Sequence, residues 1–138
     1  MTERSFLDSN VLLYADDASA GPKQTKAIEL IEAGLRSRKA VVSTQVLQEY
    51  YVIAVKKLKI PPEVGRASVE IFQTLPTSLI QCEDILAAID LQRLHTISFW
   101  DCLIIRSAIQ ARCKILYSED LQTGRRFGPL KIVNPFID

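Results

Sequence analysis

The sequence predicts an α/β protein: a three-layer α/β/α sandwich around a parallel five-stranded sheet. Short apolar runs rich in β-branched residues alternate with longer segments whose apolar residues recur at helical spacing. Single or paired helices separate most of these runs, which is the order that parallel crossover connections require. Hydrophobic residues make up 48% of the 138 residues and charged residues 24%, a balance typical of a globular protein.

The first half of the chain predicts two strands and three helical segments. Residues 23–38 carry apolar side chains at helical spacing, and Val41 and Val42 are β-branched residues typical of a buried strand. Thr44 belongs to the residue types that cap helices. The predicted elements are a strand over 4–7, a short helix over 10–15, a loop over 16–22, a helix over 23–38, a strand over 40–43 and a helix over 44–58.

The second half predicts three helices and three strands. Pro61 and Pro62 open its first helix, and Pro76 stops it. The predicted elements are a helix from 61 or 62 to 75, a strand over 78–81, a helix over 83–94, a helix from 98 or 99 to 111, and strands over 114–117 and 131–133. In the helix over 83–94 the residues expected to face the core are Ile85, Leu86, Ile89 and Leu94. We expect one domain over 1–138 and a sheet of order 3-2-1-4-5.

Composition excludes several classes of protein. The longest apolar run is Tyr50–Val55, far short of the roughly 20 residues that a membrane helix needs, so no membrane partner is expected. The N-terminal residues lack the basic and apolar regions of a signal peptide. Three cysteines without a CxxC pair indicate reduced thiols and a cytoplasmic protein. A net charge of +1 does not by itself indicate nucleic-acid binding.

Four acidic residues lie in apolar surroundings near the ends of predicted strands: Asp8, Glu49, Asp101 and Asp120. Strands one and four are neighbours in the expected sheet, so we expect all four carboxylates to face one cleft. Such carboxylates repel one another unless a cation binds, and oxygen ligands favour Mg²⁺ or Mn²⁺. A carboxylate-held metal suits hydrolysis of a phosphodiester by water. Each acid also has a structural alternative: Asp8 and Asp101 as helix-capping or first-turn acids, Asp120 as a turn residue, and Glu49 in a salt bridge to a lysine farther along its helix.

Other polar and aromatic residues allow more than one interpretation. Arg125 and Arg126 follow the fourth strand and are the basic residues nearest the expected cleft, where they could steer phosphate or form an ordinary solvated surface. His95, the single histidine, follows a helix and is expected to be a helix-end or loop residue rather than a catalytic base. Three aromatic residues near the acids could stack a base or belong to the core: Tyr14, Tyr50 and Trp100.

Four segments of this chain, in this order, resemble the motifs of PIN-domain nucleases, in particular the VapC-type toxins of toxin–antitoxin pairs. They are residues 6–14, 43–49, 97–104, and 116–124 with 130–136. The resemblance spans about residues 5–136, essentially the whole chain. Ser9 and Ser118 stand where many relatives carry threonine, and Cys102 stands where alanine is commoner. None of the four acids departs from the pattern.

The resemblance implies a Mg²⁺-dependent endoribonuclease that acts on RNA, pairs with a cognate antitoxin protein and forms a homodimer. It implies that Asp8 and Asp101 are the central metal ligands, and that Glu49 and Asp120 complete the acidic cluster. Asn10 and Ser118 occupy positions where the family often places a polar side chain beside the metal or the scissile phosphate, although they could instead be a helix cap and a turn residue. The apolar helix segment 50–55 is compatible with a dimer face. The alternative is a catalytically inactive protein of the same fold that binds RNA or a partner.

Overall fold

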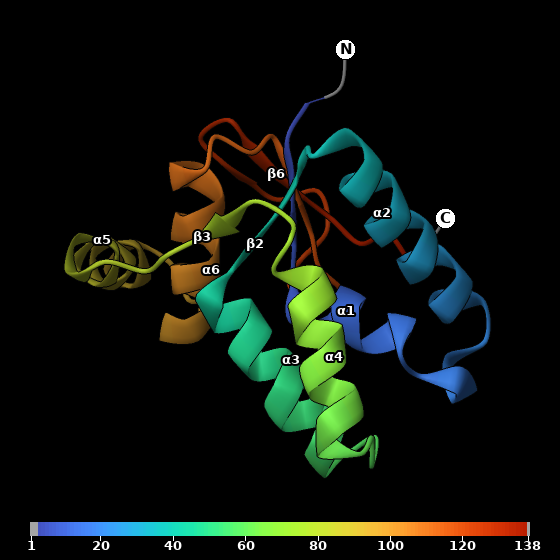
Figure 1. The fold of residues 1–138 in the computed structure, drawn as a ribbon. Helices are drawn as coiled ribbons and strands as arrows, with labels where there is room; N and C mark the ends of the chain where they lie inside the picture. The colour runs from blue at the N-terminus through green and yellow to red at the C-terminus, as the bar shows by residue number, and fades with distance from the viewer. Residues whose placement is uncertain (1–2, 138) are drawn as a thin grey trace.

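The computed structural model describes residues 3–137 and contains a mostly parallel sheet between two layers of helices (Figure 1). The strands are β1 (Ser5–Leu7), β2 (Ala40–Ser43), β3 (Thr77–Ser78), β4 (Ile115–Tyr117), β5 (Arg126–Phe127) and β6 (Leu130–Val133). Their order across the sheet is β3-β2-β1-β4-β6-β5. The five predicted strands therefore occur in the predicted order, and the α/β class is confirmed.

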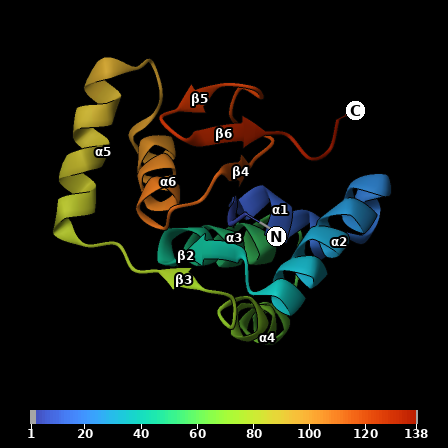
Figure 2. The ribbon, with the colours of Figure 1, turned by 90° about the horizontal axis from the view of Figure 1, so that it is seen from above.

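Helices cover both faces of this sheet. They are α1 (Ser9–Ala15), α2 (Pro22–Ser37), α3 (Thr44–Lys56), α4 (Pro62–Phe72), α5 (Cys82–Leu94) and α6 (Phe99–Gln110), with a short 3₁₀ turn over Ala18–Ala20. Figures 1 and 2 show α1–α4 on one face, and α6 with α5 outside it on the other. The helix ends differ from the predicted ends by at most three residues. No helix among residues 3–137 is long and apolar enough to cross a bilayer.

Two details of the sheet differ from the predictions. The third strand covers Thr77–Ser78 rather than 78–81, because the chain leaves the sheet at Leu79, which is 62% exposed, and Gln81 already caps α5. The sixth strand, β5, was not predicted. It pairs antiparallel with β6 across a tight turn in which Gly128 has a φ of 59°. A two-residue strand is too short for any alternation of side chains to reveal it.

The register of the central strands brings their carboxyl ends level. Leu7 of β1 lies opposite Tyr117 of β4, and Tyr117 lies opposite Val133 of β6. The Asp8 backbone N–H extends this pairing by donating to the Tyr117 carbonyl at 3.0 Å. The residues that follow β1 and β4 therefore begin from neighbouring points at one edge of the sheet.

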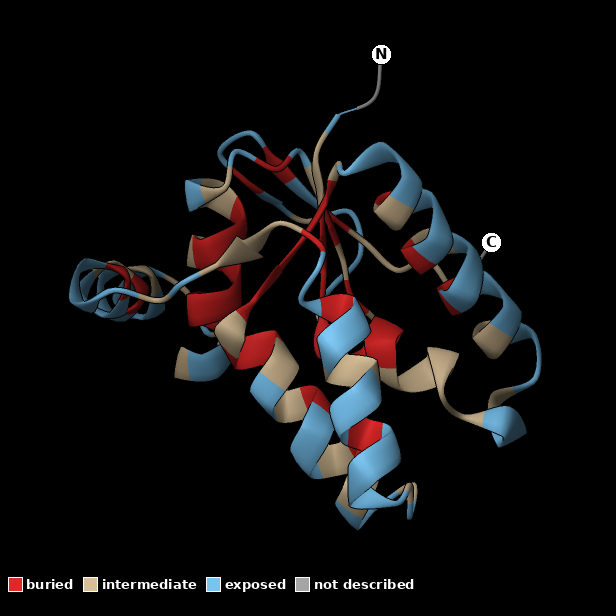
Figure 3. Ribbon diagram, in the orientation of Figure 1, coloured by how far each residue is buried: buried red, intermediate tan, exposed pale blue. Residues whose placement is uncertain are grey.

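The core lies on both sides of β1, β2 and β4, and Figure 3 shows these strands buried between helices whose outer faces are exposed. Phe6, Val42 and Leu116 of the strands are fully buried, as is Tyr50 of α3. Helix α2 approaches β2 so closely that a Cβ atom added at Gly34 would meet the Ala40 Cβ at 2.4 Å. Only glycine fits at this crossing without displacing the helix.

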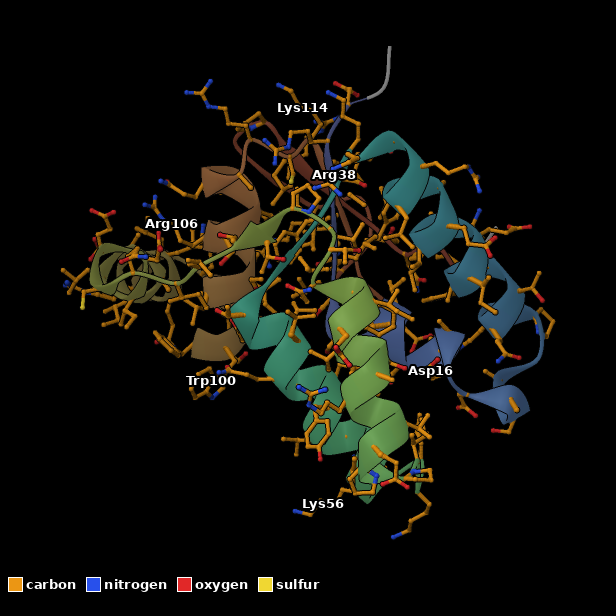
Figure 4. The ribbon with its side chains drawn as sticks, in the orientation of Figure 1. Asp16, Arg38, Lys56, Trp100, Arg106 and Lys114 are labelled. Carbon is orange, nitrogen blue, oxygen red and sulfur yellow. The ribbon has the colours of Figure 1, made fainter. Side chains whose placement is uncertain are left out.

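Helix α5 is the least enclosed element, and Figure 2 shows it as the outermost helix beside α6. The prediction that its apolar residues face the core is wrong: Ile85, Leu86, Ile89 and Leu94 are 40%, 63%, 40% and 79% exposed. The face that is buried carries Asp84 and Ala88 instead. Asp84 accepts a 2.9 Å hydrogen bond from Arg106 of α6 and a 2.8 Å bond from the Gln81 N–H. An ion pair therefore fastens α5 to the rest of the molecule, and Figure 4 shows Arg106 between the two helices.

Replacing Arg106 with methionine is expected to lower the free energy of unfolding by about 3 kcal/mol, because it leaves the buried Asp84 carboxylate without its cation. This loss is at the low end of the range expected when a buried ion pair is broken, because the Arg106 side chain is still 25% exposed. Urea unfolding measures the change. The matched control is Arg66→Met, which breaks the exposed Arg66–Glu70 pair of α4 and should cost less than about 0.5 kcal/mol. Equal small losses for both variants would contradict the anchoring role of Arg106.

Candidate active site

Asp8 lies at the junction of β1 and α1, where it ends the strand and caps the helix. Its side chain accepts 2.7 Å hydrogen bonds from the Ser9 backbone N–H and from the Ser118 hydroxyl. Asp8 is 2% exposed. Both sequence-based interpretations of this residue are therefore compatible, because the capping carboxylate is also the acid placed at the carboxyl edge of the sheet.

Asn10 and Ser118 organise the loop that follows β4. The Asn10 amide donates to the Asp120 carboxylate at 3.2 Å and to the Ser118 hydroxyl at 3.4 Å, and its oxygen accepts from the Glu119 N–H at 3.3 Å. The Ser118 hydroxyl also accepts from the Asp120 N–H at 3.1 Å. These bonds join the Asp8 segment to the Asp120 segment. The structure thus places both residues beside the acids, where the sequence motifs suggested they would be.

Glu119, although adjacent to Asp120, is held by other residues. Its carboxylate accepts from the Tyr14 hydroxyl at 2.5 Å and from the Lys23 ammonium group at 2.6 Å. Burial acts to raise the pKa of Glu119, but the bonds from Lys23 and Tyr14 outweigh it and the pKa is lowered. Glu119 is therefore a paired, ionised residue that links the loop to α2, not a member of the unpaired acidic cluster.

Glu49 lies in the second turn of α3 and Asp101 in the first turn of α6, and a buried glutamine connects the two helices. The Gln45 amide donates to the Glu49 carboxylate at 3.2 Å and to the Trp100 carbonyl at 3.1 Å. Asp101 lies in the first turn of α6, where its N–H donates to the Ser98 hydroxyl. Gln45 is 5% exposed, and its Oε1 has no partner among the described residues. The sequence analysis did not identify Gln45; its position one turn before Glu49 is the signal that could have revealed it.

The four acids form one electrostatic cluster. The pKa of Asp8 is raised to about 7, chiefly by burial and also by the charges of Asp120 and Glu49, although the hydrogen bonds from Ser118 and Ser9 act to lower it. Burial also raises the pKa of Glu49 and of Asp101, to which the charge of Asp120 contributes in both cases. The ion pairs found in residues 3–137 are Lys23–Glu119, Arg66–Glu70 and Arg106–Asp84. None of them involves the cluster, so the salt bridge considered for Glu49 does not occur there.

The donor set fits a hard divalent cation in kind and in charge. It consists of carboxylate oxygens beside amide and hydroxyl groups, and such ligands suit Mg²⁺ or Mn²⁺ rather than zinc. The raised pKa of Asp8 means that the cluster favours a proton or another cation. Within residues 3–137, however, no three acidic, histidine or cysteine side chains lie close enough together to form a ready-made metal site. Binding of an ion would therefore have to draw these side chains together.

A cleft of about 300 Å³ opens between the start of α6 and the loop after β4. Asp101, Asp120 and Arg125 are part of its lining. The expectation that all four acids face one cleft is wrong in this respect: Asp8 and Glu49 are not in the lining. Asp8 is turned instead toward the Ser9 N–H and the Ser118 hydroxyl, which hold it below the surface.

The basic and aromatic candidates separate in the structure. Arg125 lines the cleft, whereas Arg126 is exposed and lies at a different depression beside Pro129. Tyr50 is fully buried and donates to Asp16, and Tyr14 is engaged with Glu119. Trp100 is 61% exposed next to Asp101, and Figure 4 shows it at the N-terminal start of α6. Of the three aromatic candidates, Trp100 alone presents a largely exposed ring beside the acids.

Comparison with known proteins found one matching family model and several solved structures with a similar fold. The family model of the PIN domain matches residues 5–125. The solved structure of VapC20 from Mycobacterium tuberculosis, described as a sarcin–ricin-loop-cleaving toxin, is similar with a TM-score of 0.69 and 15% sequence identity over 84% of this chain and 89% of that one.

Two further solved structures are similar. One is a toxin–antitoxin complex from Klebsiella pneumoniae, with a TM-score of 0.69 and 17% identity over 96% of this chain and 98% of that one. The other is VapBC2 from Rickettsia felis bound to a DNA fragment from its promoter. It has a TM-score of 0.65 and 19% identity over 93% of this chain and 96% of that one. Comparison with curated protein sequences gave no match. At these identities the structural similarities describe a shared fold.

Proposed function

The chain belongs to the PIN-domain family, and from this membership we propose that it is a metal-dependent endoribonuclease that hydrolyses phosphodiester bonds of RNA. The observation that carries the proposal is the cluster of Asp8, Glu49, Asp101 and Asp120. These acids come from four separate segments, and the charge of Asp120 contributes to the raised pKa of each of the other three. No cation of the described residues forms an ion pair with them. Carboxylates arranged in this way favour a bound cation over solvent.

In this proposal Asp8 and Asp101 are the central ligands for Mg²⁺ or Mn²⁺, and Glu49 and Asp120 complete the site directly or through water. A metal ion held there would lower the pKa of the attacking water and stabilise charge on the departing oxygen. The chain's own residues already orient two of the four acids: two hydrogen bonds hold Asp8, and the Asn10 amide holds Asp120. The four carboxylates would still have to move closer together when an ion binds.

The surroundings of the acids suit a single-stranded RNA substrate. Trp100 offers an exposed aromatic face on which an unpaired base can stack. Arg125 brings a positive charge into the cleft that Asp101 and Asp120 line. Direct recognition of a duplex would leave the Trp100 ring without a stacking partner, because paired bases already stack on one another.

Cleavage of a mixed RNA pool with Mg²⁺ or Mn²⁺, with and without EDTA, tests the proposal. We expect metal-dependent conversion of the pool to shorter fragments. Because a nuclease of this kind can require one particular RNA, calorimetry of metal binding is the second measurement. If the protein bound neither ion, the four-carboxylate metal site would be wrong, and a PIN-fold protein that binds RNA or a partner without cutting would be the better description.

We also propose that the protein is the toxin of a toxin–antitoxin pair and binds a cognate antitoxin. Two observations support this. The VapC-like motifs span essentially the whole chain. Two of the structures that share its fold are of a toxin–antitoxin complex and of VapBC2 on promoter DNA, and each covers more than 90% of this chain.

A homodimer is the assembly we propose, with α3 at its interface. Tyr51 and Val52 of α3 are 36% and 56% exposed, and together with Leu47 and Val69 they line an apolar groove of about 560 Å³ between α3 and α4. Light scattering at micromolar concentration is expected to give twice the mass of one chain. The variant Val52→Lys should raise the dissociation constant at least tenfold, because it places a charge in an apolar contact. A wild-type monomer would contradict the proposal.

A further inference from the structure

The single histidine of the chain is not isolated. The Arg125 guanidinium lies 3.0 Å from the His95 Nδ1 and stacks over the Phe127 ring, with 4.9 Å from its central carbon to the ring centroid. His95 contacts the same ring edge-on, at 5.2 Å between centroids and an interplanar angle of 73°. His95 follows α5, Arg125 directly precedes β5, and Phe127 lies in β5. The three side chains thus form one cluster, of which Arg125 and Phe127 line the cleft.

The chemistry of this contact fixes the role of each partner. A guanidinium carries five N–H donors and no acceptor. The His95 Nδ1 must therefore accept the hydrogen bond, so the ring is in the tautomer that carries its proton on Nε2. A histidine whose Nδ1 accepts a hydrogen bond from an arginine helps to hold that arginine in place. The contact uses only one N–H of Arg125 and leaves its charge uncompensated.

Arg125 is therefore held beside carboxylates without being paired to them. It shares the lining of the cleft with Asp101 and Asp120, yet none of the ion pairs in residues 3–137 includes it. The ring nitrogen of His95 and the face of Phe127 hold it instead. An arginine that keeps free N–H donors in a polar cleft is suited to bind a phosphate through two parallel hydrogen bonds.

We propose that Arg125 binds a phosphodiester group of the RNA strand in this cleft, and that His95 and Phe127 are positioning residues that hold its guanidinium there. The proposal rests on the proposed function, since it assigns how the same site grips its substrate. It gives His95 a role that its position after a helix did not indicate. It also separates Arg125 from Arg126, because Arg126 lies outside the lining of the cleft.

Binding of a fluorescein-labelled mixed-sequence RNA, followed by anisotropy with Ca²⁺ in place of Mg²⁺ at several salt concentrations, tests the proposal. Arg125→Ala is expected to weaken binding about tenfold and to reduce the slope of log affinity against log salt by about 0.7, the effect of losing one phosphate contact on a single strand. Arg126→Ala is the matched control, because it removes the same charge from the neighbouring residue. It should change the affinity less than about threefold.

Variants of His95 separate positioning from folding. His95→Leu removes the acceptor and should weaken binding about fivefold, whereas His95→Asn keeps an acceptor close to Nδ1 and should restore most of the affinity. The double variant His95→Leu/Arg125→Ala should bind no more weakly than Arg125→Ala alone, because the two substitutions remove the same interaction. In cleavage of the RNA pool, the KM of these variants should rise while kcat stays within about threefold.

The outcomes distinguish this proposal from the proposed function. Wild-type affinity and salt slope in His95→Leu, or equal losses in the two arginine variants, would overturn it even if the enzyme cuts RNA. If the wild type bound RNA but neither cut it nor bound Mg²⁺ or Mn²⁺, the nuclease function would fail, and the expected binding pattern would still support the roles of Arg125, His95 and Phe127. If the wild type bound no RNA, both proposals would fail.

Discussion

Replacing Asp8 with asparagine is expected to reduce RNA cleavage by about a thousandfold, equivalent to about 4 kcal/mol of transition-state stabilisation. The variant keeps the local geometry. The asparagine has the size and shape of the aspartate, and its oxygen can still accept from the Ser9 N–H or from the Ser118 hydroxyl, the two groups that donate to Asp8. What it loses is the negative charge that the proposed cation needs. Initial rates on the RNA pool, together with calorimetry of metal binding, measure the effect.

Glu119→Gln is the matched control for this experiment. Glu119 lies next to Asp120, but its carboxylate is committed to Lys23 and Tyr14. The variant should therefore retain activity within about tenfold, the loss coming from a loosened loop rather than from a missing ligand. An Asp8→Asn protein that cuts RNA at the wild-type rate would remove Asp8 from the mechanism, whatever the control does.

The metal-free protein is expected to lose stability as the pH rises from about 4 to about 8. The pKa of Asp8 is raised from its ordinary 3.8 to about 7 in the folded protein, chiefly by burial. A proton is therefore bound more tightly in the folded state than in the unfolded state. The resulting stabilisation is fully present below pH 3.8 and is lost as the pH rises through about 7. Its upper size is about 4 kcal/mol, at 1.36 kcal/mol for each pKa unit.

Urea unfolding in EDTA at pH 4, 6 and 8 measures this loss, with Asp8→Asn as the reference. The variant should match the wild type at pH 4 and be more stable by about 2–4 kcal/mol at pH 8, because it has no charge to bury. Comparing the two proteins cancels the titration of other groups, including Glu119, whose lowered pKa acts in the opposite sense. Mg²⁺ or Mn²⁺ at pH 8 should stabilise the wild type selectively. Parallel pH profiles for the two proteins would show that Asp8 is not the group responsible.

Much of this arrangement could be predicted from local sequence patterns. The runs around Phe6, Val42 and Leu116 identify central strands, and the sequence of crossovers between them predicts the sheet order that the structure has. An acid directly after the first strand and another just beyond the fourth must then come together, because parallel neighbouring strands end at the same edge. This inference needs only the order of the elements and no knowledge of side-chain contacts.

The remaining features depend on contacts that no local pattern reports. Apolar residues at helical spacing in α5 indicate a helix, but periodicity does not say how much of that helix another layer covers. Leu94 is therefore exposed, while the charged Asp84 of the same helix is buried against Arg106. The bond between His95 and Arg125 joins residues 30 positions apart in the sequence. Its existence follows from where β5 lies, a strand of two residues that the sequence did not reveal.

The hydrogen bond between Ser118 and Asp8 spans 110 positions of the chain, and the Asn10–Asp120 bond spans the same distance. A chain still under synthesis on the ribosome has none of these contacts until residue 120 has emerged. Before that point Asp8 has neither the hydroxyl that orients it nor the neighbouring carboxylate of the cluster. If the site cuts RNA, a partly translated chain is harmless to the RNA around it, including the message that encodes it. The wide separation of the acids along the chain would thus delay any cleavage until residue 120 has been made.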